Sequence, residues 1–289
     1  MNKLPLPTFT ALGTFQTCLE GIGNADFKAR LENCSGTVEA EAAEYNLKAL
    51  RSELYTIPHI PTVRGLDQIV VGDLKKSELR KVYSQYMVPE SSKGWHIYDS
   101  IKVQANDKCP FCGGIGQPNT LDHYLPKANY PVFSVHPANL IPSCRDCNTG
   151  KNNDIALEAG QQILHPYFDD DYYFNEKWVY ANIIGVEPVV LEFYVSPPDH
   201  WDQISKERVV SHFTDFKLAK RYRIQAAEEL SSLIDMRNFY MIRFTEEDFK
   251  EYLLSLANGP YIINHWRRVM YQALYEDENF YSLLILSDL

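Results

Sequence analysis

The chain has 289 residues and is 45% apolar, which is enough for one large domain or two smaller ones with a substantial core. No apolar run reaches the roughly 18 residues of a membrane span, and residues 1–13 lack the basic-then-apolar pattern of a signal peptide. The net charge of −10 argues against non-specific nucleic-acid binding over the whole surface.

The first hundred residues show mainly helical patterns. Helices are predicted over 38–55, 74–88 and 98–103, with a loop at 89–94, because strong helix formers and apolar residues recur at helical spacing. We find no catalytic constellation in this part of the chain. It is therefore interpreted as scaffold or as a surface for a partner.

The next stretch, 109–151, contains two Cys-x-x-Cys pairs, which comprise Cys109, Cys112, Cys144 and Cys147. Four thiols in two such pairs can supply a complete tetrahedral shell for zinc. A structural zinc site is the favoured interpretation, and a disulfide or redox role is the alternative. Short strands over 120–125 and 139–143 and a helix over 145–156 are expected around the second pair.

Two further cysteines, Cys18 and Cys34, stand outside these pairs. We expect them to be buried, unpaired thiols rather than a disulfide, because the cysteine usage is typical of a reducing compartment. A cytoplasmic location follows as an expectation.

After residue 151 the chain becomes acidic and aromatic. Residues 165–178 are interpreted as a solvated turn with a structural histidine, His165; the alternative is a cation site formed by His165 and Asp169–Asp171. Two strands over 178–196 predict a hairpin, with the turn placed at residues 186–188.

From residue 203 to residue 289 the pattern is helical again. A helix over 213–236 carries a basic run, in which Lys217, Lys220 and Arg221 share one face and Arg223 follows. This run is interpreted either as a solvated face or as a phosphate contact. A capped helix begins at Thr245 and ends at Gly259, and a last helix covers 261–275 with Arg267 and Arg268 pointing outward.

The central stretch resembles the HNH endonuclease motif with its ββα-metal finger. The match consists of Cys-x-x-Cys, Asp122-His123-x-x-Pro126-Lys127, Asn139-Leu-x-Pro142 and Cys144-x-x-Cys147-Asn148-x-x-Lys151. The third motif position, often His, is Asn148 here, as in the histidine–asparagine–asparagine variants of that family. The resemblance implies an α+β protein in which a zinc-stapled module at 105–160 lies between a helical region at 1–104 and an α+β region at 161–289.

The resemblance also implies roles for four residues. His123 would be the general base, since a neutral imidazole is available near pH 7. Asp122 and Asn148 would hold one Mg²⁺ or Mn²⁺, because oxygen ligands suit hard cations. Asn139 would hydrogen-bond backbone across the long loop and thereby orient His123. Such a site would hydrolyse DNA to 5′-phosphate and 3′-hydroxyl ends.

Other residues near the motif receive secondary roles. Lys127, Arg145 and Lys151 are candidates for nucleic-acid contacts, and residues 101–153 carry five bases against three acids, a balance of +2. His136 is expected to be structural. Because adjacent residues on a strand point to opposite faces, Asp122 and His123 can share a site only if the strand bends or ends there.

The wider pattern also looks like stand-alone prokaryotic HNH proteins of antiphage defence, such as the nuclease subunit of Septu-type systems, which works with an ATPase partner. Two other classes stay open. One is a zinc-binding adaptor for nucleic acid or protein with an inactive nuclease fold. The other is a nuclease that acts alone, either as a toxin or as a restriction enzyme.

Overall fold

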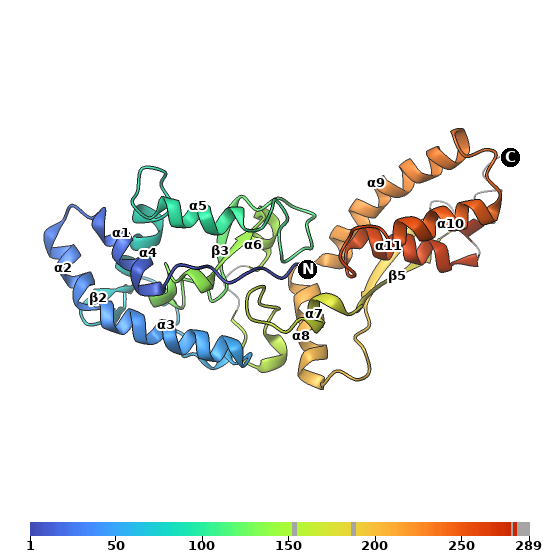
Figure 1. The fold of residues 1–289 in the computed structure, drawn as a ribbon. Helices are drawn as coiled ribbons and strands as arrows, with labels where there is room; N and C mark the ends of the chain where they lie inside the picture. The colour runs from blue at the N-terminus through green and yellow to red at the C-terminus, as the bar shows by residue number, and fades with distance from the viewer. Residues whose placement is uncertain (152–154, 186–188, 279, 282–289) are drawn as a thin grey trace.

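The computed structural model describes residues 1–151, 155–185, 189–278 and 280–281. The molecule is elongated, with the N-terminal helices at one end and the C-terminal helices at the other (Figure 1). The helices of eight or more residues are α1 Ala11–Glu20, α2 Ala25–Asn33, α3 Ser35–Leu50, α4 Lys76–Tyr86, α5 Trp95–Val103, α8 Gln203–Asp215, α9 Leu218–Phe239, α10 Glu246–Ala257 and α11 Trp266–Glu276. The shorter ones are α6 Arg145–Lys151, α7 Tyr172–Asn175, η1 Leu54–Thr56, η2 Pro131–Phe133, η3 Pro137–Asn139 and η4 Ala159–Gln161.

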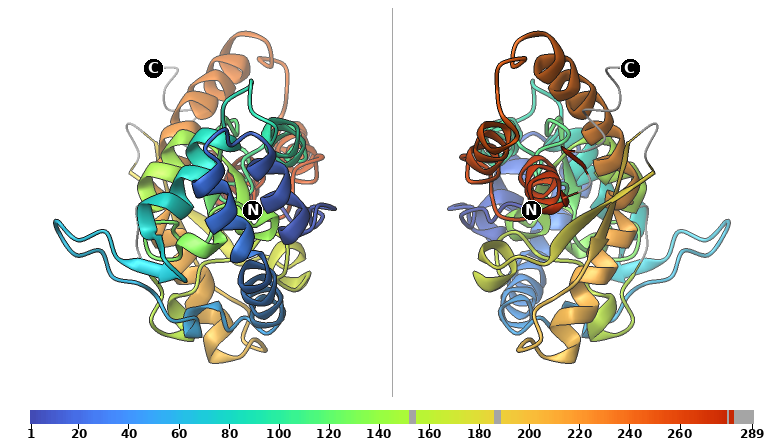
Figure 2. Two further views of the ribbon diagram at one scale, coloured as in Figure 1. Left: turned by 90° about the vertical axis from the view of Figure 1, so that its left-hand side faces the viewer. Right: turned by 90° about the vertical axis from the view of Figure 1, so that its right-hand side faces the viewer.

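The strands of the described residues form three antiparallel two-stranded sheets. They are β1 Ile69–Val71 with β2 Leu74–Lys75, β3 Thr120–His123 with β4 Leu140–Ser143, and β5 Val179–Ile184 with β6 Val190–Val195. The fold is therefore a mixture of helices and small sheets, as expected. The segment that leads from η1 to β1 projects away from the body (Figure 2).

The N-terminal helices share a core with the central sheet. Leu121, Val135 and Leu140 pack in the same buried cluster as apolar residues of α1, α2, α4 and α5. Tyr45 and Ala49 of α3 belong instead to the second cluster, which contains the four cysteines of the central stretch. The sequence pattern changes near position 105, but each of the two apolar clusters contains residues from both sides of that position.

The C-terminal end is built on the β5–β6 hairpin. Helices α9 and α11 pack against these strands, and α10 packs on α11 (Figure 1). Asn264 ties this lobe together, because its Oδ1 accepts the backbone N–H groups of Trp178 and Val179 and its Nδ2 donates to the carbonyl of Glu176. The hairpin agrees with the prediction; its expected turn at 186–188 lies outside the described residues.

Several helix ends differ from the predictions for local reasons. Helix α3 ends at Leu50 rather than 55, because Ser52 adopts a φ of 56°. The helix expected over 213–236 is two helices, α8 and α9, because Lys217 between them has a φ of 52°. Lys217 therefore does not continue the helical face of Lys220 and Arg221.

Other boundaries shift as well. Helix α4 begins at Lys76, because residues 74 and 75 form β2, and α11 begins at Trp266, where the His265 side chain caps it. Helix α6 ends at Lys151; Ala156 is not helical, and residues 152–154 lie outside the described part. Arg267 is not simply outward, since it pairs with Glu229 at 2.8 Å.

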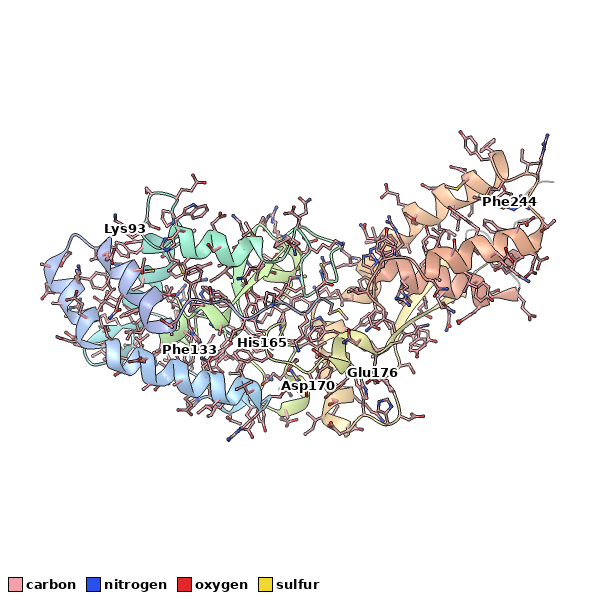
Figure 3. All side chains as sticks on the ribbon, in the orientation of Figure 1. Lys93, Phe133, His165, Asp170, Glu176 and Phe244 are labelled. Carbon is pink, nitrogen blue, oxygen red and sulfur yellow. The ribbon has the colours of Figure 1, made fainter. Side chains whose placement is uncertain are left out.

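Residues 165–167 and Asp169 are buried and Phe168 is half-buried, so the expected solvated turn is wrong for this first part of 165–178. His165 is 1% exposed and Asp169 2% exposed, and Figure 3 places His165 inside the body. Asp169 accepts from the His165 backbone N–H at 2.7 Å and pairs with the buried Arg208 at 2.7 Å. His165 itself lies against Tyr45 and Tyr124, so it is structural, as predicted, and Asp169 is committed to an arginine rather than to a cation site.

We expect Arg208→Met to lower the free energy of unfolding by about 3–5 kcal/mol, because it leaves the Asp169 carboxylate buried without its charged partner. Thermal or denaturant unfolding measures this loss. Adding Asp169→Asn to that variant removes the stranded charge and should recover part of the stability. A single variant as stable as the parent, or a double variant less stable than the single, would contradict this account.

Cys18 and Cys34 are free and buried, as predicted. Burial raises the pKa of the Cys18 thiol to about 12, which makes it unreactive. Among the helices that the structure describes, none is long and apolar enough to cross a membrane.

Candidate metal centre and histidine site

The four cysteines of the central stretch form one buried cluster. Their Sγ atoms all lie within 4.8 Å of one another, and Cys112 Sγ is 3.9 Å from Cys144 Sγ. Tetrahedral zinc with Zn–S bonds of about 2.3 Å separates its sulfur ligands by roughly 3.8 Å. The arrangement therefore fits a structural zinc ion, and none of the four thiols forms a disulfide.

Three glycines build the turn that presents the first cysteine pair. Gly113 and Gly114 have φ values of 68° and 95°, which non-glycine residues rarely adopt. Gly116 accepts the backbone N–H of Cys109 through its carbonyl at 3.1 Å. A Cβ at Gly116 would lie 2.6 Å from the Cβ of Cys144, so only glycine allows the two cysteine turns to approach.

The adjacent strand β3 carries Asp122 and His123. It pairs in regular register with β4 through its last residue, so these two side chains leave the strand on opposite faces and the strand ends at His123. The Asp122 carboxylate is buried, and its Oδ2 has no hydrogen-bond partner among the residues that the structure describes. Burial raises the pKa of Asp122, which the charge of Lys151 opposes. An unsatisfied buried carboxylate oxygen is a position that a cation would stabilise.

The His123 imidazole is held in one orientation. Its Nε2 lies 2.9 Å from the carbonyl oxygen of Ser134, and the ring packs edge-on against Tyr83 with centroids 4.5 Å apart. Because a carbonyl can only accept, Nε2 carries the proton and Nδ1 carries the lone pair. Burial, together with the charge of Lys127, holds the pKa of His123 well below its ordinary value, so the neutral form dominates at pH 7.

Asn139 clamps the loop between β3 and β4. Its Nδ2 donates to the carbonyls of Leu125 and Phe133 at 3.1 and 3.2 Å, and its Oδ1 accepts the N–H of Leu125 at 2.7 Å. Phe133 directly precedes Ser134, whose carbonyl holds His123. The expected cross-loop hydrogen bonds of Asn139 are thus present. His136, also predicted to be structural, is buried with its Nε2 3.1 Å from Asn46 Oδ1.

Lys151 has a different environment from the one that a phosphate contact needs. Its Nζ is buried, donates to the backbone carbonyls of His123 and Tyr124, and lies 3.7 Å from Asp122 Oδ2. Burial lowers the pKa of Lys151, although Asp122 opposes this shift. Lys151 therefore fixes the end of β3 rather than reaching toward a ligand.

Asn148 precedes Lys151 by three residues on α6 and so lies on the same helical face. Its side chain is half-buried and, in the described part of the chain, makes no hydrogen bond. It remains available as an oxygen ligand next to β3, which α6 contacts. The structure thus gathers Asp122, His123 and Lys151 around the end of β3, with Asn148 on the adjoining helix.

The positive charges around His123 come from two regions. Lys127 is half-buried above the Tyr83 ring, and the exposed Arg80 of α4 is close enough to lower the pKa of both Lys127 and His123. Arg145 is exposed at the start of α6. The sequence did not indicate a role for Arg80 or Tyr83, because the pattern over α4 showed only an apolar helical face. In the structure, the Tyr83 hydroxyl connects α4 to β3 by donating to the carbonyl of Leu121 at 3.0 Å.

The fold and the site define a mixed helical and small-sheet protein with a four-cysteine cluster able to bind zinc. The chain belongs to the family of Protein ea31 of Escherichia phage lambda, to which it is 36% identical over 302 aligned positions that cover 97% of this chain and 99% of the phage protein. No protein-family model matches the chain, and no solved structure matches it. The name of the phage relative states no activity.

Proposed function

We propose that this protein is a metal-dependent endonuclease of the HNH type, with a zinc-stapled ββα-metal module, that hydrolyses phosphodiester bonds of DNA. The observation that carries the proposal is the end of β3. There, a neutral histidine with a fixed Nε2 proton directly follows a buried aspartate whose Oδ2 has no hydrogen-bond partner among the described residues, and the charges of Lys127 and Lys151 act on both side chains. The consecutive β3, β4 and α6, next to four clustered cysteines, support it.

In this proposal each residue has one task. The Nδ1 lone pair of His123 takes a proton from the attacking water, and the Ser134 carbonyl keeps the ring in place. Asp122 and Asn148 would hold Mg²⁺ or Mn²⁺, which supplies charge stabilisation to the phosphate and the leaving oxygen. Asn139 and Lys151 fix the loop and the strand end.

The local charge agrees with a DNA substrate. Lys127 and Arg80 provide positive charge close to His123, and Arg145 adds an exposed cation at the start of α6, whereas the chain as a whole carries −10. This distribution favours delivery of a polyanion to one place. We extend the proposal, on the resemblance to Septu-type nuclease subunits, to an effector that works with an ATPase partner in prokaryotic antiphage defence.

The second candidate is an adaptor that uses the zinc module only to bind nucleic acid or protein. The observation that favours it is the depth of the site, since Asp122 is 7% exposed and His123 4% exposed. An adaptor needs no proton acceptor at His123, so the loss of cleavage on substituting that residue separates the two functions.

The metal assignment is tested by titrating zinc-loaded protein with Mn²⁺ and following free Mn²⁺ by electron paramagnetic resonance. We expect Asp122→Asn to weaken binding by about 10- to 100-fold or more, because a direct ligand should matter at least as much as the groups that orient ligands. The matched control is Asp107→Asn, an exposed acid of the same region with a φ of 58°, which asparagine tolerates. Equal affinity in the parent and Asp122→Asn, or no binding by the parent, would overturn the assignment.

A further inference from the structure

One residue of the basic run at 217–223 faces the cysteine cluster instead of solvent. Arg221 lies in the first turn of α9, and its Nη1 donates to Cys147 Sγ at 3.1 Å while its Nη2 is 3.6 Å from Cys144 Sγ. Asp146 Oδ2 is 3.8 Å from the same Nη2. The guanidinium thus spans both sulfurs of the second Cys-x-x-Cys pair, from a helix more than seventy positions away along the chain.

The charges explain why a cation belongs there. Zn²⁺ with four thiolates carries a net charge of about −2, and such a centre is expensive to bury without compensation. A guanidinium keeps its charge at any ordinary pH, and Arg221 holds it within 3.1 Å of Cys147 Sγ and 3.6 Å of Cys144 Sγ. Its planar fork gives N–H groups from two separate nitrogens to the two sulfurs in a fixed geometry, whereas a lysine has a single nitrogen to place between them.

The neighbouring residue also joins α9 to the cysteine region. The Tyr222 hydroxyl is buried 3.5 Å from the carbonyl oxygen of Cys112, and its ring packs against Phe193 of β6. Arg221 and Tyr222 therefore contact the module on one side, and Tyr222 contacts the C-terminal hairpin on the other. By contrast, Lys220 and Arg223 are exposed.

We propose that Arg221 is a positioning residue of the zinc centre, which neutralises the thiolates of Cys144 and Cys147 and couples zinc retention to the docking of α9. The coupling is reciprocal, since a contact that favours zinc binding in the docked state must favour docking in the zinc-bound state. This inference rests on the zinc assignment and is independent of nuclease activity. It also removes Arg221 from the residues available to DNA phosphates.

The test compares Arg221→Gln and Arg221→Lys with Arg223→Gln, a matched loss of charge two residues further along the same helix. Zinc transfer from each purified protein to a competing chromogenic chelator gives the apparent zinc affinity. We expect Arg221→Gln to weaken zinc binding by about 10- to 100-fold, as for other groups that hydrogen-bond metal ligands. Arg221→Lys should fall between Gln and the parent, since it keeps the charge and loses the fork, and Arg223→Gln should match the parent.

The absorption spectrum of cobalt-substituted protein distinguishes a direct contact with the sulfurs from a purely structural role of Arg221. In protein loaded with Co²⁺ in place of zinc, N–H···S bonds withdraw electron density from sulfur, so the thiolate-to-cobalt charge-transfer band should shift to lower energy in Arg221→Gln. Amide hydrogen exchange should accelerate in both α6 and the first turns of α9 in that variant. The Arg223→Gln protein should show neither change.

The outcomes are separable. If the parent binds zinc tightly and Arg221→Gln shows the parent's affinity, spectrum and exchange, the role of Arg221 is overturned while the zinc site stands. If the parent binds no zinc at the four cysteines, the zinc assignment itself fails, whatever Arg221 does.

Discussion

Cys144→Ser is expected to abolish zinc binding and unfold the central module. The strands β3 and β4 have four residues each, and Cys109, Cys112, Cys144 and Cys147 lie inside the main apolar cluster. Structural zinc contributes apparent binding free energies of about 10–16 kcal/mol in small zinc modules. A serine at this position removes one thiolate and leaves the other three buried without their metal.

Zinc content by mass spectrometry and the cooperativity of thermal unfolding measure this effect. Cys34→Ser is the matched control, because that thiol lies outside the cluster and donates only a long contact to the Val71 carbonyl, which a hydroxyl can replace. A Cys144→Ser protein that retains zinc would show that the four cysteines are not a structural metal site. The same would follow if the zinc-free variant melted at the temperature of the zinc-loaded parent.

His123→Ala is expected to reduce DNA cleavage by about 10²- to 10⁴-fold, the usual contribution of a general base. The loss should appear with zinc content unchanged and at an assay temperature well below the variant's own melting point, since removing the buried imidazole also costs the Ser134 hydrogen bond and the Tyr83 contact. His200→Ala, which alters an exposed histidine paired with Glu176, is the control for preparation and contamination. Cleavage by His123→Ala at the parent's rate would remove His123 from the mechanism.

The pH dependence adds a check on the same residue. Because burial holds the pKa of His123 well below its usual value, the neutral base persists as the pH falls through 6.5. The rate–pH profile of the parent should therefore keep its His-dependent activity below pH 6.5 and lose it only at lower pH. An acid limb centred near 6.5 would indicate an exposed, unperturbed base instead.

Local patterns predicted much of the central stretch. The Cys-x-x-Cys spacing indicated the cluster, and the order of strand, loop, strand and helix is the observed order of β3, β4 and α6. The backbone hydrogen bonds of Asn139 were expected from the family resemblance and are present. These features depend on residues close together in sequence, which is why spacing and propensity can indicate them.

The features that sequence could not supply come from distant segments. Lys151 is buried because its ammonium meets the carbonyls of residues 27 and 28 positions earlier. Tyr83 reaches β3 across 38 positions, and Arg221 reaches Cys147 across 74. In the sequence, each of these residues looked like part of an ordinary helix, and only the tertiary packing gives it a neighbour. Asp169, which was expected in a solvated turn, is likewise buried through tertiary packing, because its arginine partner lies 39 positions away.

The most direct test of the proposed nuclease is the conversion of supercoiled plasmid by purified, zinc-loaded protein in Mg²⁺ or Mn²⁺, beside His123→Ala and a chelated control. We expect nicked or linear product with 5′-phosphate and 3′-hydroxyl ends from the parent alone, only in the presence of the divalent metal. Cleavage that persists in His123→Ala or after chelation, or no cleavage by the parent in either metal, would contradict the proposed nuclease function.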